Sequence, residues 1–273
     1  MMFSNNWRDE ECKKRRLTAG ESDFERDLAD RVYTSQLIGT VPDLVMHGGG
    51  NTSCKTKAKD LFEEEIDVLC IKGSGWDLGT IQVAGLPAVR LEPLLKLRNL
   101  AKLSDEDMVN VQRANLLDSS SPNPSVETLL HAFLPHKFID HTHSTPFLTL
   151  ANLPDPEAAM REIFGNRFAI VPYVMPGFDL AKLAAKIHDK TPDIDGLLLA
   201  KHGHFTWGDT AKESYDRVID HTNRVDAWLQ KYRSQPTVQV KRPEASTVQV
   251  FLQSLRGALS NCSGDAATSF IFD

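Results

Sequence analysis

The sequence predicts a folded protein in which helices and strands alternate along the chain, of the α/β or the α+β class. Three observations support this class. The 273 residues are enough to bury a substantial core. The shares of hydrophobic residues, 41%, and of charged residues, 25%, are ordinary for a globular protein and exclude a disordered or fibrous one. Short apolar runs typical of strands are interspersed with segments whose apolar residues recur at helical spacing.

Two predicted helices begin with a serine that can cap the first turn. Ser22 stands three residues before Glu25, which is the spacing of a capping box. Ser104 is followed by acidic residues and predicts a helix to Leu117. Further helices are expected over 123–134, opened by an Asn-Pro pair, over about 210–233 and over 246–259. Apolar runs predict strands over 66–71, 138–142, 168–174 and 197–200, and a strand-like run ends the chain at 269–273.

Charge and cysteine usage exclude several classes of function. The formal net charge is −6, whereas a nucleic-acid-binding protein usually carries a basic surplus. The four cysteines form no CxxC pair, as expected of reduced thiols in a cytoplasmic protein. The chain has no apolar run of about 18 residues, and its polar N-terminus does not look like a signal peptide. We therefore expect a small-molecule partner, and neither a nucleic acid nor a membrane.

Histidines gather at two places that a fold could bring together. His141 and His143 alternate on a predicted strand, so their side chains leave the same face. His202 follows the end of another strand, and the glycine after it leaves room for a close approach. His204 competes for the same role. Three histidines with one open position form a ligand set of catalytic zinc. An H-x-H motif alone is more often two ordinary histidines.

Glu127 is the candidate acid–base residue. It falls in the first turn of the predicted helix 123–134, where the positive helix end and free N–H groups favour a carboxylate. Compensation of the helix charge is the plainer interpretation. The same N–H groups, with the Ser125 hydroxyl, form a pocket that suits phosphate. His131, one turn later, is expected to pack or to support the site.

Two glycine-rich loops could add to that anion pocket. The segment 47–53 contains Asn51, and the segment 72–77 contains Ser74 and Gly75. Backbone N–H groups in such loops can wrap an anionic group without adding charge. Tight turns between elements are the alternative explanation for both loops.

Five short motifs occur in the order found in one known family. They are Gly50-Asn51-Thr52-Ser53, Gly73-Ser74-Gly75, Pro124-Ser125-Val126-Glu127, His141-Thr142-His143 and Lys201-His202-Gly203. Over about residues 24–233 the chain resembles the class II aldolase/adducin family, whose enzymes include fuculose-phosphate and rhamnulose-phosphate aldolases. A closer resemblance, over 68–80, 123–131 and 170–178, is to the aldolase part of bifunctional rhamnulose-1-phosphate aldolase/short-chain dehydrogenase proteins. The resemblance implies a three-layer α/β/α fold around a central, mostly antiparallel sheet.

The resemblance also implies a site and a reaction. The reaction is the cleavage of a ketose 1-phosphate, similar to rhamnulose 1-phosphate, to dihydroxyacetone phosphate and an aldehyde by a cytoplasmic homotetramer. A sugar-phosphate 4-epimerase, a dehydratase and a non-catalytic adducin-like binding domain are the alternatives. The implied site residues are His141, His143 and His202 for one Zn²⁺ per chain, Glu127 for catalysis, and Asn51, Ser74, Gly75 and Ser125 for phosphate.

The chain departs from the family pattern in two ways. Val126 stands where relatives often have a second serine, which removes one phosphate donor. The aldolases take a catalytic tyrosine from a neighbouring subunit, and Tyr173 is only a candidate for it. We expect a flexible arm over 1–20, a catalytic domain over 21–235, and an extension over 236–273 that could begin a missing dehydrogenase region.

Overall fold

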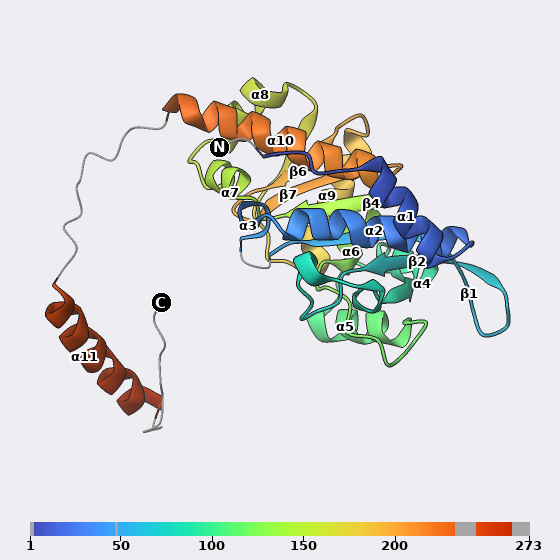
Figure 1. The fold of residues 1–273 in the computed structure, drawn as a ribbon, viewed down its shortest axis with the longest axis horizontal. Helices are drawn as coiled ribbons and strands as arrows, with labels where there is room; N and C mark the ends of the chain where they lie inside the picture. The colour runs from blue at the N-terminus through green and yellow to red at the C-terminus, as the bar shows by residue number, and fades with distance from the viewer. Residues whose placement is uncertain (1–2, 47–48, 233–243, 264–273) are drawn as a thin grey trace. The chain divides into compact units, whose positions relative to one another are not determined.

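The computed structural model describes residues 3–46, 49–232 and 244–263. Residues Met1–Tyr232 form one unit and Arg233–Asp273 a second. In the described part, one sheet organises the first unit, with the strand order β3-β2-β1-β4-β7-β6-β5 (Figure 1). Neighbouring strands are antiparallel except β5 and β6, which are parallel. The strands are β1 Asn51–Lys59, β2 Glu65–Ile71, β3 Ala88–Arg90, β4 Phe138–Thr142, β5 Phe168–Val171, β6 Gly196–Leu199 and β7 Gly203–Gly208.

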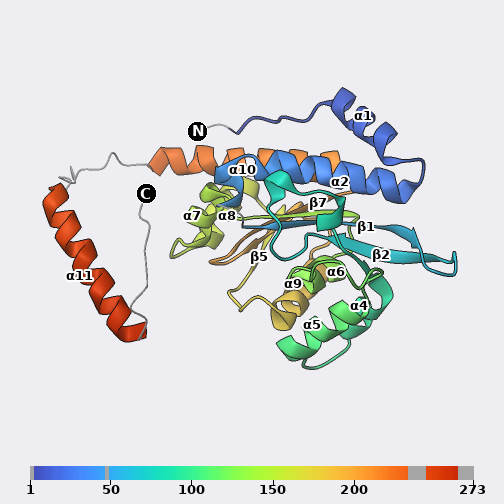
Figure 2. The same cartoon turned by 60° about the horizontal axis from the view of Figure 1, so that its bottom comes forward.

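Helices cover both faces of this sheet and confirm the predicted α/β class with three layers. Figure 2 shows α2 and α10 on one face, and α4, α6 and α9 on the other. The helices of the first unit are α1 Asp9–Ala19, α2 Asp23–Gly39, α3 Pro42–Val45, α4 Leu91–Leu97, α5 Asp105–Ala114, α6 Thr128–Phe133, α7 Thr145–Ala151, α8 Pro156–Phe164, α9 Phe178–Lys190 and α10 Ala211–Tyr232.

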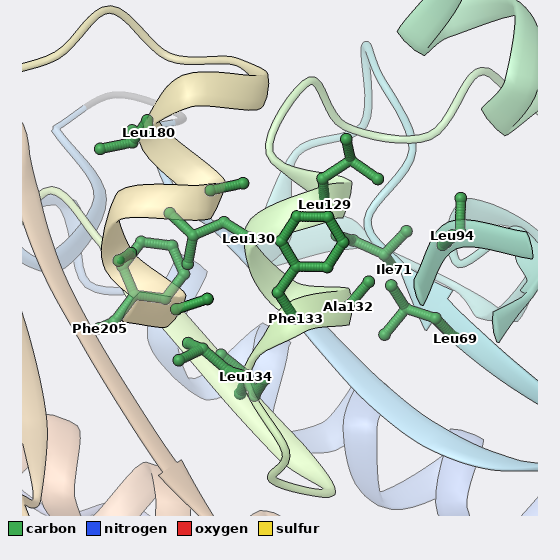
Figure 3. Packing of buried hydrophobic residues seen from close by; sticks show 14 of the residues in the cluster. Leu69, Ile71, Leu94, Leu129, Leu130, Ala132, Phe133, Leu134, Leu180 and Phe205 are labelled. Carbon is green, nitrogen blue, oxygen red and sulfur yellow. The ribbon is translucent and has the colours of Figure 1, made fainter. Parts of the chain in front are cut away.

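Alternation along β2 explains why the sheet is buried on both faces. Leu69 and Ile71 belong to the core beneath α6 and α9, whereas Val68 and Cys70 belong to the core beneath α2 and α10. Figure 3 shows Leu69 and Ile71 beside the leucines and the phenylalanine of α6. Each fully buried aliphatic side chain of this kind contributes about 1.5–3 kcal/mol.

Both predicted serine caps are confirmed. The hydroxyl of Ser22 accepts a hydrogen bond from the Glu25 N–H at 3.2 Å, and the Glu25 carboxylate accepts one from the Ser22 N–H at 3.1 Å. Ser104 caps α5 in the same way, since its hydroxyl accepts from the Asp107 N–H at 3.1 Å.

The segment 1–20, expected to be a flexible arm, contains a helix in its described part. Residues Asp9–Ala19 form α1, in which Cys12 is buried. Arg16 of α1 pairs with the buried carboxylate of Asp30 in α2. One face of the basic segment therefore packs against the unit, which its charge pattern alone did not indicate.

The prediction of a helix over 123–134 is correct only in its second half. α6 begins at Thr128 with Glu127 as its N-cap. The residues before it are extended: Pro124 bridges to Gly73, and the Ser74 N–H donates to the Asn123 carbonyl at 2.7 Å. These contacts between loops hold the Asn-Pro pair outside the helix.

A buried ion pair joins α2, β4 and α10. The guanidinium of Arg31 pairs with the carboxylate of Asp140, and both side chains are fully buried. The Ser214 hydroxyl donates to the same carboxylate. Arg31 also donates to the carbonyls of Ser53 in β1 and Ile139 in β4.

The second unit contains helix α11, Ala245–Ser263, close to the helix predicted over 246–259. The strand-like run 269–273 lies outside the described residues. Among the described helices, none combines the length and the apolar character that crossing a membrane requires.

Candidate active site

Three histidines converge at the ends of inner strands of the sheet. The ring nitrogens that His141, His143 and His202 direct toward each other all lie within 4.8 Å of one another. His141 lies near the end of β4, His143 directly follows that strand, and His202 lies in the turn between β6 and β7. Burial lowers the pKa of His143 to about 4 and shifts those of His141 and His202 below their usual value. All three are therefore neutral near pH 7, the form that ligates metal ions.

A backbone carbonyl and an aromatic ring fix the orientation of the His141 ring. Its Nδ1 lies 3.1 Å from the carbonyl oxygen of His204, which can only accept, so Nδ1 carries the hydrogen. Its ring stacks on Phe205 with centroids 4.2 Å apart. The Nε2 lone pair consequently faces the other two histidines.

Of the two candidates for the third metal-binding histidine, His202 and His204, only His202 lies beside His141 and His143. His202 lies with the cluster, and its ring centroid is 5.0 Å from that of His141. His204 is fully buried in β7, where its Nδ1 bonds to the Thr142 hydroxyl at 2.9 Å and its ring stacks on Phe147. His204 therefore has a packing role.

Gly203 permits the close approach that the sequence suggested. A Cβ at this position would lie 2.6 Å from the Thr142 carbonyl oxygen and 2.9 Å from Cδ2 of His143. Lys201, two residues earlier, has a φ of 58° and makes the tight turn that presents His202. The turn and the strand end can meet only because Gly203 lacks a side chain.

We expect Gly203→Ala to weaken metal binding while the unit stays folded. The Cβ would push the strand end away from Thr142, and overpacking of this kind costs about 1–3 kcal/mol. Zinc affinity, measured by competition with a chromophoric chelator, should fall relative to wild type. Gly257→Ala is the matched control, because a Cβ there meets nothing within 4 Å. Unchanged zinc affinity in Gly203→Ala would contradict this expectation.

Glu127 lies against the histidine cluster. Its Oε2 is 3.4 Å from Nε2 of His141, and its Oε1 is 3.3 Å from Nε2 of His202. Oε2 accepts a hydrogen bond from the Asn51 amide at 2.7 Å, whereas buried Oε1 has no hydrogen-bond partner among the described residues. Burial raises the pKa of Glu127 to about 7, and the Asn51 hydrogen bond opposes that rise.

The three segments expected to bind phosphate lie side by side. The Ser74 N–H donates to Asn123 at 2.7 Å, and the Ser125 N–H donates to the Lys72 carbonyl at 3.2 Å. Asn51 donates to the Ser125 hydroxyl at 3.1 Å. The backbone N–H groups of Ser74 and Ser125, which we expected to face an anion, are therefore already engaged.

Other donors at this place remain available. The Ser125 oxygen accepts from Asn51 and from the Glu127 N–H at 3.3 Å, so its own hydrogen can be donated elsewhere. Gly75 has open space where a Cβ would stand. Lys72 is half-buried, and desolvation lowers its pKa.

A model of the class II aldolase and adducin N-terminal domain matches residues 30–229. The chain belongs to the class II aldolase and adducin family. This confirms the family predicted from the five motifs. Class II aldolases are typically metal dependent, and the three histidines supply a cluster that could bind a metal.

Two relatives differ in how much of this chain they share. YuxG, an uncharacterised oxidoreductase of Bacillus subtilis, is 38% identical over 204 residues, which are 75% of this chain but only 30% of that protein. A methylthioribulose-1-phosphate dehydratase of Pseudomonas savastanoi is 27% identical over 157 residues, 50% of this chain and 77% of the relative.

Solved structures of class II aldolases agree with the fold. The N-terminal class II aldolase domain of a conserved Thermoplasma acidophilum protein is 40% identical, with a TM-score of 0.73, and covers 83% of this chain and 99% of that domain. An L-fuculose 1-phosphate aldolase has the same fold at 18% identity and a TM-score of 0.52, and covers 87% of this chain and 98% of its own.

The donor set at the histidine cluster fits a divalent cation. The His141 lone pair and the Glu127 carboxylate face each other at 3.4 Å. Oε1 of Glu127 is buried and has no partner in the described part of the chain. A cation bound by neutral imidazoles would offset the mutual repulsion of these electron-rich atoms. Imidazole ligands suit zinc better than magnesium or calcium, which prefer oxygen ligands.

Val126, which departs from the family pattern, and Tyr173, the candidate for the catalytic tyrosine, are both exposed. Val126 is 58% exposed and directly precedes the buried Glu127. Tyr173 is 53% exposed, and its hydroxyl contacts the Met175 sulfur at 3.2 Å.

Proposed function

We propose that this chain is a zinc-dependent aldolase that cleaves a ketose 1-phosphate, similar to rhamnulose 1-phosphate, to dihydroxyacetone phosphate and an aldehyde. The observation that carries the proposal is the convergence of three neutral histidines and one buried carboxylate. His141, His143 and His202 would hold the ion, and Glu127 would act as the acid–base residue.

The zinc ion, when bound, would supply Lewis-acid polarisation of the substrate carbonyl. Glu127 would move a proton at the carbon next to that carbonyl, which must gain one after the carbon–carbon bond breaks. Burial raises the pKa of Glu127 to about 7, which suits an acid–base residue that works near neutral pH. Phosphate binding would supply binding energy away from the reacting bond.

The proposed phosphate site consists of Ser74, Gly75 and Ser125, with Asn51 beside them. Asn51 already uses both amide hydrogens, on Glu127 and Ser125. The Ser125 hydroxyl hydrogen is therefore the best-placed neutral donor, and Lys72 could replace the serine that Val126 lacks.

We expect Ser125→Ala to raise KM for a ketose 1-phosphate and to change kcat little. A hydrogen bond to a charged group contributes about 1.5–3 kcal/mol, so KM should rise roughly 10- to 100-fold. Ser120→Ala is the matched control, since that hydroxyl is exposed and bonds to Asp118 at 2.6 Å. If KM were unchanged in Ser125→Ala, this residue would not bind the phosphate.

The test of the function is direct. The purified, zinc-loaded chain should release dihydroxyacetone phosphate from a ketose 1-phosphate, measured with a coupled reductase, and a chelator should stop the release. No release from any ketose 1-phosphate would contradict the proposal, while zinc retained by the three histidines would leave the metal site standing.

A dehydratase is the second candidate, favoured by the dehydratase relative described above. There the same carboxylate would remove a proton next to the carbonyl, and a hydroxyl would leave as water. Mass spectrometry of the products separates the two reactions, because an aldolase yields two fragments and a dehydratase yields one product lighter by one water.

The assembly and location are part of the proposal. We expect a cytoplasmic homotetramer, and light scattering that reports a monomer at micromolar concentration would contradict the tetramer. The chain spans about 30% of the length of the Bacillus subtilis relative, so a following dehydrogenase region stays a prediction.

A further inference from the structure

Side chains on one face of β1 contact α6, the short helix whose N-cap is Glu127. Asn51, Ser53 and Lys55 alternate along this strand, so their side chains share a face. Lys55 donates to the carbonyls of His131, Leu134 and His136 at 2.6–2.8 Å, at the C-terminal end of α6. α6 has only six residues, too few for a stable helix on its own. Its position therefore depends on these contacts.

His131 connects two members of this face. Its Nε2 contacts Oδ1 of Asn51, and its Nδ1 lies 2.8 Å from the Ser53 hydroxyl. His131 and Ser53 are fully buried, and Asn51 is 5% exposed. Burial keeps the pKa of His131 well below its usual value, so the ring is neutral and carries a single hydrogen.

The donors and acceptors allow one arrangement of that hydrogen while Asn51 donates to Glu127. The amide nitrogen of Asn51 faces the Glu127 carboxylate at 2.7 Å and the Ser125 oxygen at 3.1 Å. Its carbonyl oxygen, which can only accept, therefore faces Nε2 of His131. Nε2 must then carry the hydrogen, and Nδ1 must accept one from the Ser53 hydroxyl.

We propose that Ser53 and His131 fix the amide of Asn51 so that it donates to the Glu127 carboxylate, which makes Asn51 and His131 positioning residues. The role in catalysis rests on the proposed function of Glu127. Without the hydrogen on Nε2, the amide could turn its oxygen toward the carboxylate. The two oxygens would then repel each other, and Glu127 would leave its place between His141 and His202.

The position of the hydrogen can be measured without any activity assay. In protein labelled with ¹⁵N-histidine, the ring nitrogens of His131 report which of them is protonated, and His131→Gln identifies the signal among the nine histidines. We expect the hydrogen on Nε2. A hydrogen on Nδ1 would overturn the inference, whether or not the chain proves to be an aldolase.

Two substitutions of His131 separate positioning from packing. Gln places an amide N–H where Nε2 stands, whereas Asn reaches only the place of Nδ1, next to Ser53. We expect His131→Asn to lower kcat roughly 10- to 100-fold, as loss of a supporting hydrogen bond commonly does, and to leave bound zinc unchanged. His131→Gln should restore kcat. Equal kcat in the two variants would overturn the inference.

Ser53→Ala provides a milder test in case His131→Asn fails to fold. Without the hydroxyl, Nδ1 loses its donor, and the hydrogen can occupy either ring nitrogen. We expect a mixture of the two forms in the ¹⁵N spectrum and a lower kcat. A wild-type spectrum with wild-type kcat would count against the role of Ser53. If the wild-type chain cleaves no ketose 1-phosphate, the proposed function fails, and the ¹⁵N spectrum still decides this inference.

Discussion

His202→Ala is expected to lose its zinc and almost all activity. The substitution removes one of three imidazoles whose nitrogens lie within 4.8 Å of one another. Because Lewis-acid stabilisation contributes several kcal/mol to a transition state, kcat/KM should fall by roughly three orders of magnitude or more. The zinc content, measured by atomic absorption after dialysis, should fall from about one ion per chain toward zero, because two histidines remain of the three protein ligands that a catalytic zinc site uses.

The control for this experiment is a histidine outside the three-histidine cluster. His136 bonds to His188 at 2.9 Å and stacks on Trp207, and we expect His136→Asn to keep its zinc. Wild-type protein stripped with a chelator should regain activity when zinc is added, whereas His202→Ala should not. A His202→Ala protein that keeps full zinc occupancy would show that His202 is not a ligand.

Glu127→Gln is expected to keep the fold and the zinc but to lose most turnover. The amide preserves the shape of the side chain and removes its ability to take a proton. General acid–base catalysis contributes about 10²- to 10⁴-fold, so kcat should fall by that factor. The measurements are kcat for a ketose 1-phosphate, zinc content and the thermal unfolding midpoint.

A surface glutamate supplies the matched control for this substitution. Glu92 pairs with Lys96 in an exposed i, i+4 ion pair, and pairs of this kind contribute little to stability. We expect Glu92→Gln to behave as wild type. Unchanged kcat in Glu127→Gln would end the catalytic assignment of Glu127 and leave the histidine assignment intact.

Most strands that sequence alone predicted begin with or consist of a short hydrophobic run. β2, β5 and β6 are such runs, β4 begins with Phe138 and Ile139, and β5 ends just before Pro172, which cannot donate to a ladder. β1 was missed because its first three buried residues are polar: the side chains of Asn51, Thr52 and Ser53 form hydrogen bonds with other elements. A hydrophobic pattern cannot show such partners.

The candidate site was predictable in its residue types and less so in its local geometry. The spacing of His141 and His143 on a strand was enough to place them together. The choice between His202 and His204 depends on where β7 begins, because the start of the strand at Gly203 turns His204 into the core. The engagement of the Ser74 and Ser125 N–H groups depends on a contact between loops some 50 residues apart along the chain, which no local pattern reports.

The buried pair of Arg31 and Asp140 has a consequence for how the first unit unfolds. Loss of either partner would leave an uncompensated buried charge, at a cost of about 3–5 kcal/mol. The pair and its contacts with Ser53 and Ser214 tie α2, β1, β4 and α10 together. Neither α2 nor β4 can detach without leaving a buried charge unpaired, so the amides of these two elements should exchange with solvent only through global opening. β4, which carries His141 and is followed directly by His143, is therefore expected to lose its order last, together with the whole unit.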